Sequence, residues 1–260
     1  MLQKRVNLFG FLVDDVDLTK ALSFSENSLG DGKARVFFTP NLEMLSAAYR
    51  SEGARRMLSG SDVSLPDGFG LKIVSGLLGE PLENTVPGID FGEGLLRLAS
   101  HRGDGVFLLG GREGVAERAA QALASKYRKL RICGVHHGYF GDDEASLVCE
   151  KINASGARIL IVCRGFPRQE KFVSQYRDVL PCVKVFACLG GSLDVWSGDV
   201  RRAPAIIRKA HLEWLWRIIL EPERLTRFVC SLDVIFAAMG LGMRKILPYR
   251  GMKARAGEYN

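Results

Sequence analysis

Short apolar runs alternate with amphipathic stretches along most of this chain. Apolar runs typical of buried strands occur at 7–13, 36–38, 62–65, 106–109, 131–135, 158–163 and 183–188. Between them, apolar residues recur at helical spacing over 17–28, 69–78, 86–101, 115–127 and 142–153. This alternation predicts an α/β fold with a mainly parallel, Rossmann-like sheet and helices on both faces. We expect the first run, 7–13, to enter that sheet.

Polar turns follow two of the predicted strands. Thr39 and Asn41 come directly after the strand at 36–38, and Asp67 follows the strand at 62–65. The carboxyl ends of parallel strands meet at one edge of the sheet, where ligands bind. Asp67 is held between a proline and a glycine at this edge, which makes it our candidate general base. The alternative is an ordinary turn residue whose carboxylate bonds its own backbone.

The other polar residues at this edge also have two interpretations. Thr39 followed by a proline is an ordinary start for a helix, so it either caps the helix or contacts a ligand, and both can hold at once. Gln169 lies in the first turn of the helix after the strand at 158–163, where an amide can bond a ligand or the backbone. We favour ligand contact for Gln169. Its neighbour Glu170 suits the dipole of the helix start.

Two glycine turns after strands are candidate phosphate sites. Gly110 and Gly111 follow one strand and Gly190 and Gly191 follow another, so backbone N–H groups can face an anion there. A dinucleotide dehydrogenase would also place an acid after the strand at 131–135. This chain has His-His-Gly-Tyr there instead, which argues against a nicotinamide cofactor.

The sequence offers little that would bind a metal. Asp15 and Asp17 form a two-carboxylate pattern, but Asp17 also stands where a helix would be capped. We therefore expect no metal and no cofactor. The six cysteines include no CxxC pair and most lie in apolar runs, so we expect buried free thiols in a reducing compartment.

The character of the chain changes after Gly198. Up to residue 200 there are 24 Lys and Arg against 24 Asp and Glu, whereas the remainder has 12 against 5, so the net charge of +7 lies at this end. We predict an α/β core over 1–198 and a basic, amphipathic appendage over 199–260. The apolar stretch 228–243 is too short and interrupted to span a bilayer. It would lie on an anionic membrane or dock on the core. Basic residues at the N-terminus precede only a short apolar run, which is not a signal peptide, so we expect a cytoplasmic protein.

Eight sequence blocks in order carry a resemblance to a known family. They are TPNLEML, LPDGFG, VPGID, FLLGGREG, HHGYF, GFPRQEK, GGSLDVWSGDVRRAP and HLEWLWRIILEPERLTR. Together they resemble the WecG/TagA/CpsF bacterial glycosyltransferases, glycosyltransferase family 26, over roughly residues 5 to 230. The resemblance implies an inverting enzyme that moves a hexose from a UDP-sugar to a sugar on a polyprenyl diphosphate. It also implies a role in exopolysaccharide or cell-envelope glycan synthesis, on the inner face of the cytoplasmic membrane.

The resemblance also implies roles for individual residues. Asp67 would be the catalytic base, and Thr39, Asn41 and Gln169 would line the sugar pocket. The appendage would meet the membrane and contribute the arginines Arg217, Arg224 and Arg227. With the glycine turns, these arginines would neutralise the leaving diphosphate. We expect the appendage to close over the nucleotide only at the membrane.

One departure from the family pattern concerns a cation near the base. The family often has an arginine three residues before the glycine of VPGID, and this chain has Thr85. Arg112 or the appendage would then have to supply that contact.

Two other classes of function compete with the transferase. A nucleotide-dependent oxidoreductase lacks the expected ribose-binding acid. A non-enzymatic membrane scaffold would explain the basic appendage but not the polar strand ends. No nucleic-acid motif accompanies the basic residues, so we expect no nucleic-acid partner. The transferred sugar (N-acetylmannosamine, its uronic acid or glucose) and any homo-oligomer do not follow from the sequence.

Overall fold

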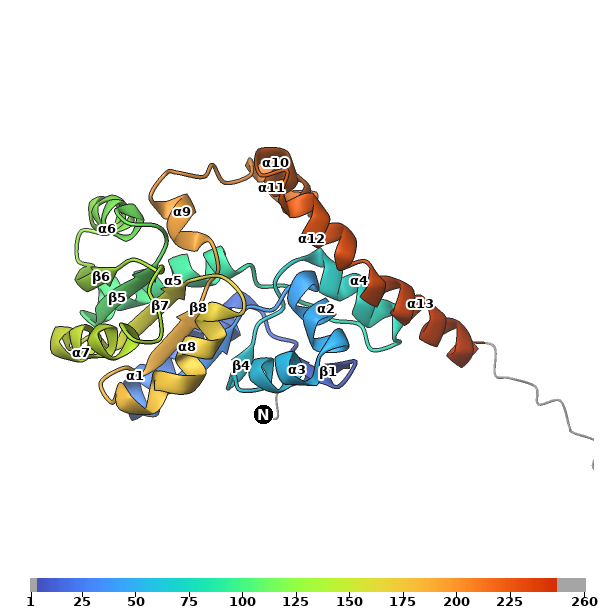
Figure 1. The fold of residues 1–260 in the computed structure, drawn as a ribbon, viewed down its shortest axis with the longest axis horizontal. Coiled ribbons are helices and arrows are strands. Elements are labelled where there is room, and N and C mark those ends of the chain that lie inside the picture. The colour runs from blue at the N-terminus through green and yellow to red at the C-terminus, as the bar shows by residue number, and fades with distance from the viewer. Residues whose placement is uncertain (1–3, 247–260) are drawn as a thin grey trace, which may run out of the picture.

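The computed structural model describes residues 4–246, with side chains up to 241, and contains a six-stranded parallel sheet between two layers of helices (Figure 1). In spatial order the strands are β4 (Val63–Ser64), β3 (Arg35–Phe38), β8 (Val185–Cys188), β7 (Ile159–Cys163), β5 (Gly105–Gly110) and β6 (Arg131–His136). Every neighbouring pair runs parallel. The predicted α/β fold with a mainly parallel sheet is therefore confirmed.

The two faces of the sheet pack against different helices. Along β7, Leu160 and Val162 face one core, whereas Ile159 and Ile161 face the other, as the alternation of a strand requires. The first core contains residues of α2 (Leu42–Arg50), α3 (Glu52–Leu58), α4 (Phe69–Leu77), α7 (Ala145–Ser155) and α8 (Arg168–Tyr176). The second contains residues of α1 (Leu18–Asp31), α5 (Gly88–Arg102), α6 (Val115–Lys126) and α9 (Ser192–Trp196).

The first apolar run does not join this sheet. It forms a separate antiparallel hairpin of β1 (Arg5–Leu8) and β2 (Phe11–Asp14), so the prediction for 7–13 was wrong. Phe9 and Gly10 both have positive φ, of 55° and 84°, which is the geometry of a two-residue hairpin turn. The Asn7 side chain accepts a hydrogen bond from the Gly10 N–H at 2.7 Å and stabilises the turn.

Asp15 and Asp17, the two carboxylates of the possible metal pattern, both bond other parts of the protein. Asp17 caps α1 by accepting a hydrogen bond from the Lys20 N–H at 2.7 Å, which confirms the capping interpretation. Asp15 accepts hydrogen bonds from the backbone N–H groups of Glu83 and Asn84 and pairs with Lys4. Both carboxylates therefore have protein partners.

The cysteines differ in their exposure. All six are free thiols, and Cys149, Cys163 and Cys188 are buried as expected. Cys182 and Cys230 are exposed and Cys133 is half-buried, so the expectation of buried thiols was wrong for these three. Cys182 lies in the turn before β8 and Cys230 is the last residue of α12, where an apolar neighbour in the sequence does not imply burial.

Four helices follow the core, and the last packs back onto it (Figure 1). They are α10 (Ala205–Lys209), α11 (Glu213–Leu220), α12 (Arg224–Cys230) and α13 (Asp233–Ile246). Helix α13 contacts α4 and α2 and buries Val234 and Ala238 in the first core. Asp233 pairs with Arg50 at 2.6 Å and accepts a hydrogen bond from Ser46 at 2.8 Å. For 228–243 the docked alternative is thus confirmed for one face of α13, while Phe236 and Met239 on that helix are exposed.

Within 4–246, no helix has the length and apolar character needed to cross a membrane.

The end of β5 requires glycine. Gly110 has φ 145°, and a Cβ there would lie 2.2 Å from the Cys163 carbonyl oxygen of the neighbouring strand. That same carbonyl accepts a hydrogen bond from the Gly111 N–H at 3.1 Å. The close approach of two backbones therefore fixes how β5 leaves the sheet.

We predict that Gly110→Ala destabilises the protein by at least about 3 kcal/mol, because a backbone clash adds to a disallowed φ. Gly156→Ala is the matched control: Gly156 also has a positive φ, of 64°, but nothing lies within 4 Å of the added Cβ. That control should cost only about 1–2 kcal/mol. Denaturant unfolding measures both, and equal losses for the two variants would contradict the clash.

Candidate active site

The loops after β3 and β4 are joined by backbone hydrogen bonds around Asp67. The Asp67 N–H donates to the Pro40 carbonyl at 2.9 Å, and the Val86 N–H donates to the Pro66 carbonyl at 2.8 Å. The Asp67 carboxylate accepts a hydrogen bond from the backbone N–H of Gly88, at the start of α5. Asp67 is therefore held between three segments rather than bonded within its own turn, and its side chain is half-buried.

The surroundings of Asp67 suit a general base. Desolvation raises the pKa of Asp67 to about 6, although the Arg217 charge and the Gly88 hydrogen bond oppose the shift. The negative charges of Glu213 and Asp90 raise the pKa further. A carboxylate with such a pKa is mostly ionised at neutral pH and still has an appreciable affinity for a proton, as general base catalysis requires.

Thr39 and Asn41 have different contacts after β3, and the ligand contact predicted for both stays a prediction. Asn41, not Thr39, caps α2, since its side-chain oxygen accepts a hydrogen bond from the Met44 N–H at 3.1 Å. The buried Thr39 hydroxyl donates to the Cys188 carbonyl at the end of β8, at 2.9 Å. A Cβ on Gly88 would lie 3.1 Å from the Thr39 Oγ1 atom, so Thr39 also packs against the residue that bonds Asp67.

Gln169 is placed beneath the second glycine turn. Its Oε1 atom accepts a hydrogen bond from the Gly190 N–H at 3.0 Å, and its Nε2 atom donates to Glu170 at 2.8 Å. Gln169 is almost fully buried. Its hydrogen bonds therefore support the loop after β8, and its contact with a ligand stays a prediction.

In both glycine turns a backbone N–H already has an acceptor within the protein. The Gly111 N–H is occupied by the Cys163 carbonyl, and the Gly111 carbonyl accepts a hydrogen bond from the Gly138 N–H at 2.8 Å. The Gly190 N–H is occupied by Gln169. Direct contact of a phosphate with the Gly111 or Gly190 N–H would therefore displace an existing bond.

The appendage reaches the loop that carries Asp67. His211 stacks on Phe69, the first residue of α4, with ring centroids 5.0 Å apart. Arg217 of α11 is close enough for its charge to lower the pKa of Asp67. The structure thus brings the predicted base and one predicted arginine together.

The other two predicted arginines lie elsewhere. Arg224 pairs with Glu221 at 2.6 Å, and its charge acts on Asp194 of α9, as does that of Arg112. Arg224 and Arg112 therefore gather near the helix that follows the Gly190 turn. Arg227 is exposed, and its contact with the site stays a prediction.

Arg202 is a site residue that the sequence did not indicate. Its guanidinium pairs with Asp90 in the first turn of α5 and lies 3.7 Å from Glu213 of α11. Arg202 thereby connects the core to the helix that carries Arg217. The RRAP run is visible in the sequence, but nothing there pairs Arg202 with a residue 112 positions away.

Thr85 stands on the same loop as Gly88 and is half-buried. Arg202 reaches the VPGID segment through its ion pair with Asp90. Within the described residues, no group of three or more His, Cys, Asp or Glu side chains is placed to hold a metal.

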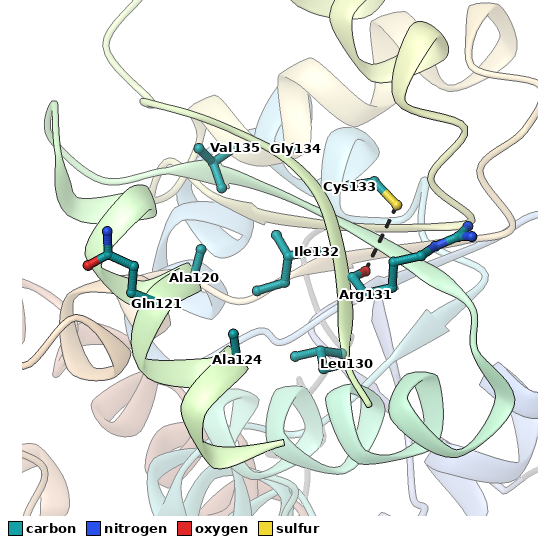
Figure 2. Close-up of a pocket in the computed structure, with 9 residues that line it drawn as sticks. All are labelled: Ala120, Gln121, Ala124, Leu130, Arg131, Ile132, Cys133, Gly134 and Val135. Atoms are coloured by element: carbon teal, nitrogen blue, oxygen red, sulfur yellow. Dashed lines mark hydrogen bonds between the residues drawn. The ribbon is translucent and has the colours of Figure 1, made fainter. Parts of the chain in front are cut away.

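A separate cavity of about 510 Å³ lies between β6 and α6 (Figure 2). It is lined by Ala120, Gln121, Ala124 and the residues 130–135, and no carboxylate lines it. Its place at the outer strand of the sheet separates it from Asp67, which follows the opposite outer strand, β4.

An open parallel sheet with a partly desolvated carboxylate at its carboxyl edge, and with the charge of Arg217 acting on it, suits a group-transfer enzyme. Residues 6–248 match the Glycosyl transferase WecG/TagA/CpsF family. The chain belongs to this family, and it is a sugar-transferring enzyme. Non-enzymatic scaffolding is thereby excluded, and sugar transfer replaces the oxidoreductase alternative.

Two curated relatives cover most of the chain. A protein of Bacillus spizizenii is 34% identical over 230 residues, 88% of each chain. A protein of Bacillus subtilis is 34% identical over 214 residues, 82% of each chain. Both are named N-acetylglucosaminyldiphosphoundecaprenol N-acetyl-beta-D-mannosaminyltransferase.

We predict opposite shifts in the pKa of Asp67 when the two charges of α11 are removed one at a time. Arg217→Gln removes a stabilising cation and should raise the pKa above about 6, whereas Glu213→Gln should lower it. Carboxyl-carbon NMR of the Asp67 side chain follows the titration directly. Arg208→Gln, on the exposed face of α10, is the control and should change nothing. Shifts of the same sign from both α11 variants would show that α11 does not cover Asp67 in solution.

Proposed function

We propose that this enzyme transfers a hexose, with inversion, from a UDP-sugar to a sugar carried on a polyprenyl diphosphate in cell-envelope glycan or exopolysaccharide synthesis. By analogy with its relatives, we assign N-acetylmannosamine as the transferred sugar and N-acetylglucosaminyl diphosphoundecaprenol as the acceptor. The observation that carries the proposal is the half-buried Asp67, with its raised pKa and with the charge of Arg217 on α11 acting on it.

Asp67 takes the proton of the acceptor hydroxyl. As the O–H bond breaks, that oxygen attacks the anomeric carbon from the face opposite the diphosphate, and the bond from that carbon to the diphosphate oxygen breaks. The attack turns an α-linked donor into a β-linked product, which agrees with the β-mannosaminyl group in the relatives' names. The electron pair leaves with UDP.

The leaving diphosphate needs positive charge nearby. We assign this role to Arg217 together with Arg112 and Arg224, whose charges converge on Asp194 beside the turn of Gly190 and Gly191. Thr39 and Gln169 hold the end of β8 that carries this turn. No metal or other cofactor takes part in this scheme.

The appendage supplies the contact with the membrane. Many of the exposed large apolar side chains of the described chain lie after residue 205; the most exposed are Ile206, Phe236 and Ile219. Basic residues accompany them, so the appendage has the composition of a surface that lies on an anionic bilayer. We place the enzyme in the cytoplasm, peripherally on the inner face of the membrane, with α11 closing over the donor when the lipid acceptor is present.

Replacing the base tests the mechanism. Asp67→Asn keeps the size of the side chain and removes its basicity, so kcat should fall by roughly 100- to 10,000-fold while the fold is retained. The assay measures UDP release from UDP-N-acetylmannosamine with a short polyprenyl diphosphate N-acetylglucosamine acceptor. Asp178→Asn, at a carboxylate that is almost fully exposed, is the control. Turnover of Asp67→Asn at the wild-type rate would refute the assignment.

Membrane contact is tested by removing exposed apolar groups without truncating α13, which is part of the core. Replacing Ile206, Ile219 and Phe236 together by Ser should reduce binding to anionic vesicles by more than about tenfold, because each buried apolar side chain contributes about 1.5–3 kcal/mol. The control is Leu147→Ser with Val179→Ser, two exposed apolar positions outside the appendage. Vesicle flotation measures both, and equal binding by the triple variant and the wild type would contradict the assignment.

A further inference from the structure

Glu170 is a buried carboxylate that the proposed reaction does not use. It lies in the first turn of α8 and is completely buried. One of its oxygens, Oε1, accepts a hydrogen bond from the Nε2 atom of Gln169, whereas Oε2 is buried with no hydrogen-bond partner among the described residues. An unpartnered carboxylate oxygen is costly in a protein interior, so this group needs a reason to be there.

Glu170 is one end of a chain of hydrogen bonds that leads to the Gly190 turn. The amide of Gln169 links the two, because its Oε1 atom accepts from the Gly190 N–H and its Nε2 atom donates to Glu170. Gly190 has a positive φ of 57°, so its N–H direction belongs to a particular turn conformation. The orientation of one buried amide thus determines whether that N–H has an acceptor.

The ionisation of Glu170 decides the orientation of that amide. An ionised carboxylate can only accept hydrogen bonds, so the NH₂ group of Gln169 must face it and the carbonyl oxygen must face Gly190. A protonated Glu170 carries a donor, and Oε2 has no acceptor for it. Turning the carboxyl group toward Gln169 and rotating the Gln169 amide would give this O–H an acceptor. The rotation would take the amide oxygen away from the Gly190 N–H.

We propose that Glu170 is a positioning residue: protonated Glu170 competes with the Gly190 N–H for the single amide oxygen of Gln169, so that the turn holds its shape only when Glu170 is ionised. The consequence for sugar transfer rests on the proposed function, which places this turn beside the leaving diphosphate. The consequence for the turn itself does not.

The surroundings of Glu170 place the protonation of its carboxylate near neutral pH. Burial raises the pKa of Glu170 to about 7, and the hydrogen bonds from the Gln169 amide and from the backbone N–H of Glu170 itself oppose the shift. The thiol of Cys188 on β8 lies on the α8 side of the sheet, whereas that of Cys163 on β7 faces the second core. Burial raises the pKa of both thiols, that of Cys163 to about 12. They are therefore neutral throughout this range.

Charged side chains on the elements that pack against α8 have other contacts. Lys171 pairs with Asp142, Arg168 lies over Tyr139, Arg177 pairs with Asp62 and Asp178, and Arg56 pairs with Glu52. Arg55 extends toward Gly10. Within the described residues, no ion pair of Glu170 offsets the cost of its ionisation.

Hydrogen exchange of the Gly190 amide, resolved by NMR and corrected for the intrinsic rate, tests the proposal without any substrate. The Gly111 amide, bonded to the Cys163 carbonyl, is the internal reference. In the wild type, protection of Gly190 relative to Gly111 should fall roughly tenfold between about pH 8 and about pH 6. Unchanged relative protection over that range would overturn the proposal.

Two substitutions distinguish this competition from simple packing. Glu170→Gln keeps the shape but always carries a donor, so Gly190 should be poorly protected even near pH 8. Glu170→Met carries no donor, so protection should persist and lose its pH dependence. If the role were only structural, the isosteric Gln would be the better tolerated of the two. Gly190 protection in Glu170→Gln equal to that of the wild type near pH 8, or an unchanged pH dependence in Glu170→Met, would also overturn the proposal.

Transfer activity gives the corresponding readout in the proposed reaction. As the pH is lowered, kcat/KM of the wild type should fall with the binding of two protons, one on Glu170 and one on Asp67. In Glu170→Met it should fall with the binding of one proton, on Asp67. If no UDP-sugar is consumed at all, the proposed function fails, while the exchange measurement still decides the role of Glu170.

Discussion

Parallel pairing of β8 with the strands on both of its sides holds the site together. Cys188, the last residue of β8, pairs with Phe38 of β3 and with Val162 of β7. The chain segments that follow these three strands therefore emerge at the same level of the sheet. Thr39, Gly190 and the loop that leads to Gln169 become neighbours because of this register, although they are far apart in the sequence.

Side-chain hydrogen bonds to the backbone then fix the loops at that edge. Thr39 binds the Cys188 carbonyl, Gln169 binds the Gly190 N–H, and the Gly88 N–H binds Asp67. These bonds set the backbone of the loops, and the Asp67 side chain stays only half-buried. The loops of the site are thus held by hydrogen bonds, while the Asp67 side chain remains partly accessible to a substrate.

The appendage has two different relations to the core. Helix α13 is part of the hydrophobic core through Val234 and Ala238 and is anchored by Asp233. Helix α11 instead meets the core through charged and aromatic contacts, with Arg202 between Asp90 and Glu213 and with His211 on Phe69. Charged contacts at a surface are individually weak. Helix α13 is thus docked through apolar side chains, whereas the contacts of α11 with the core are charged and aromatic.

The sequence by itself determined the class of fold, the place of Asp67 after a strand and the family, because apolar periodicity and ordered motifs are local properties of the chain. It misplaced 7–13, since an apolar run looks the same in a hairpin as in a sheet. It assigned the helix cap to Thr39 rather than Asn41 as one option, because both residue types can cap. Only the tertiary structure decided that Arg202 joins Asp90 to Glu213 and that Gln169 supports Gly190. Those contacts depend on strand order and register, which bring together residues that no local pattern connects.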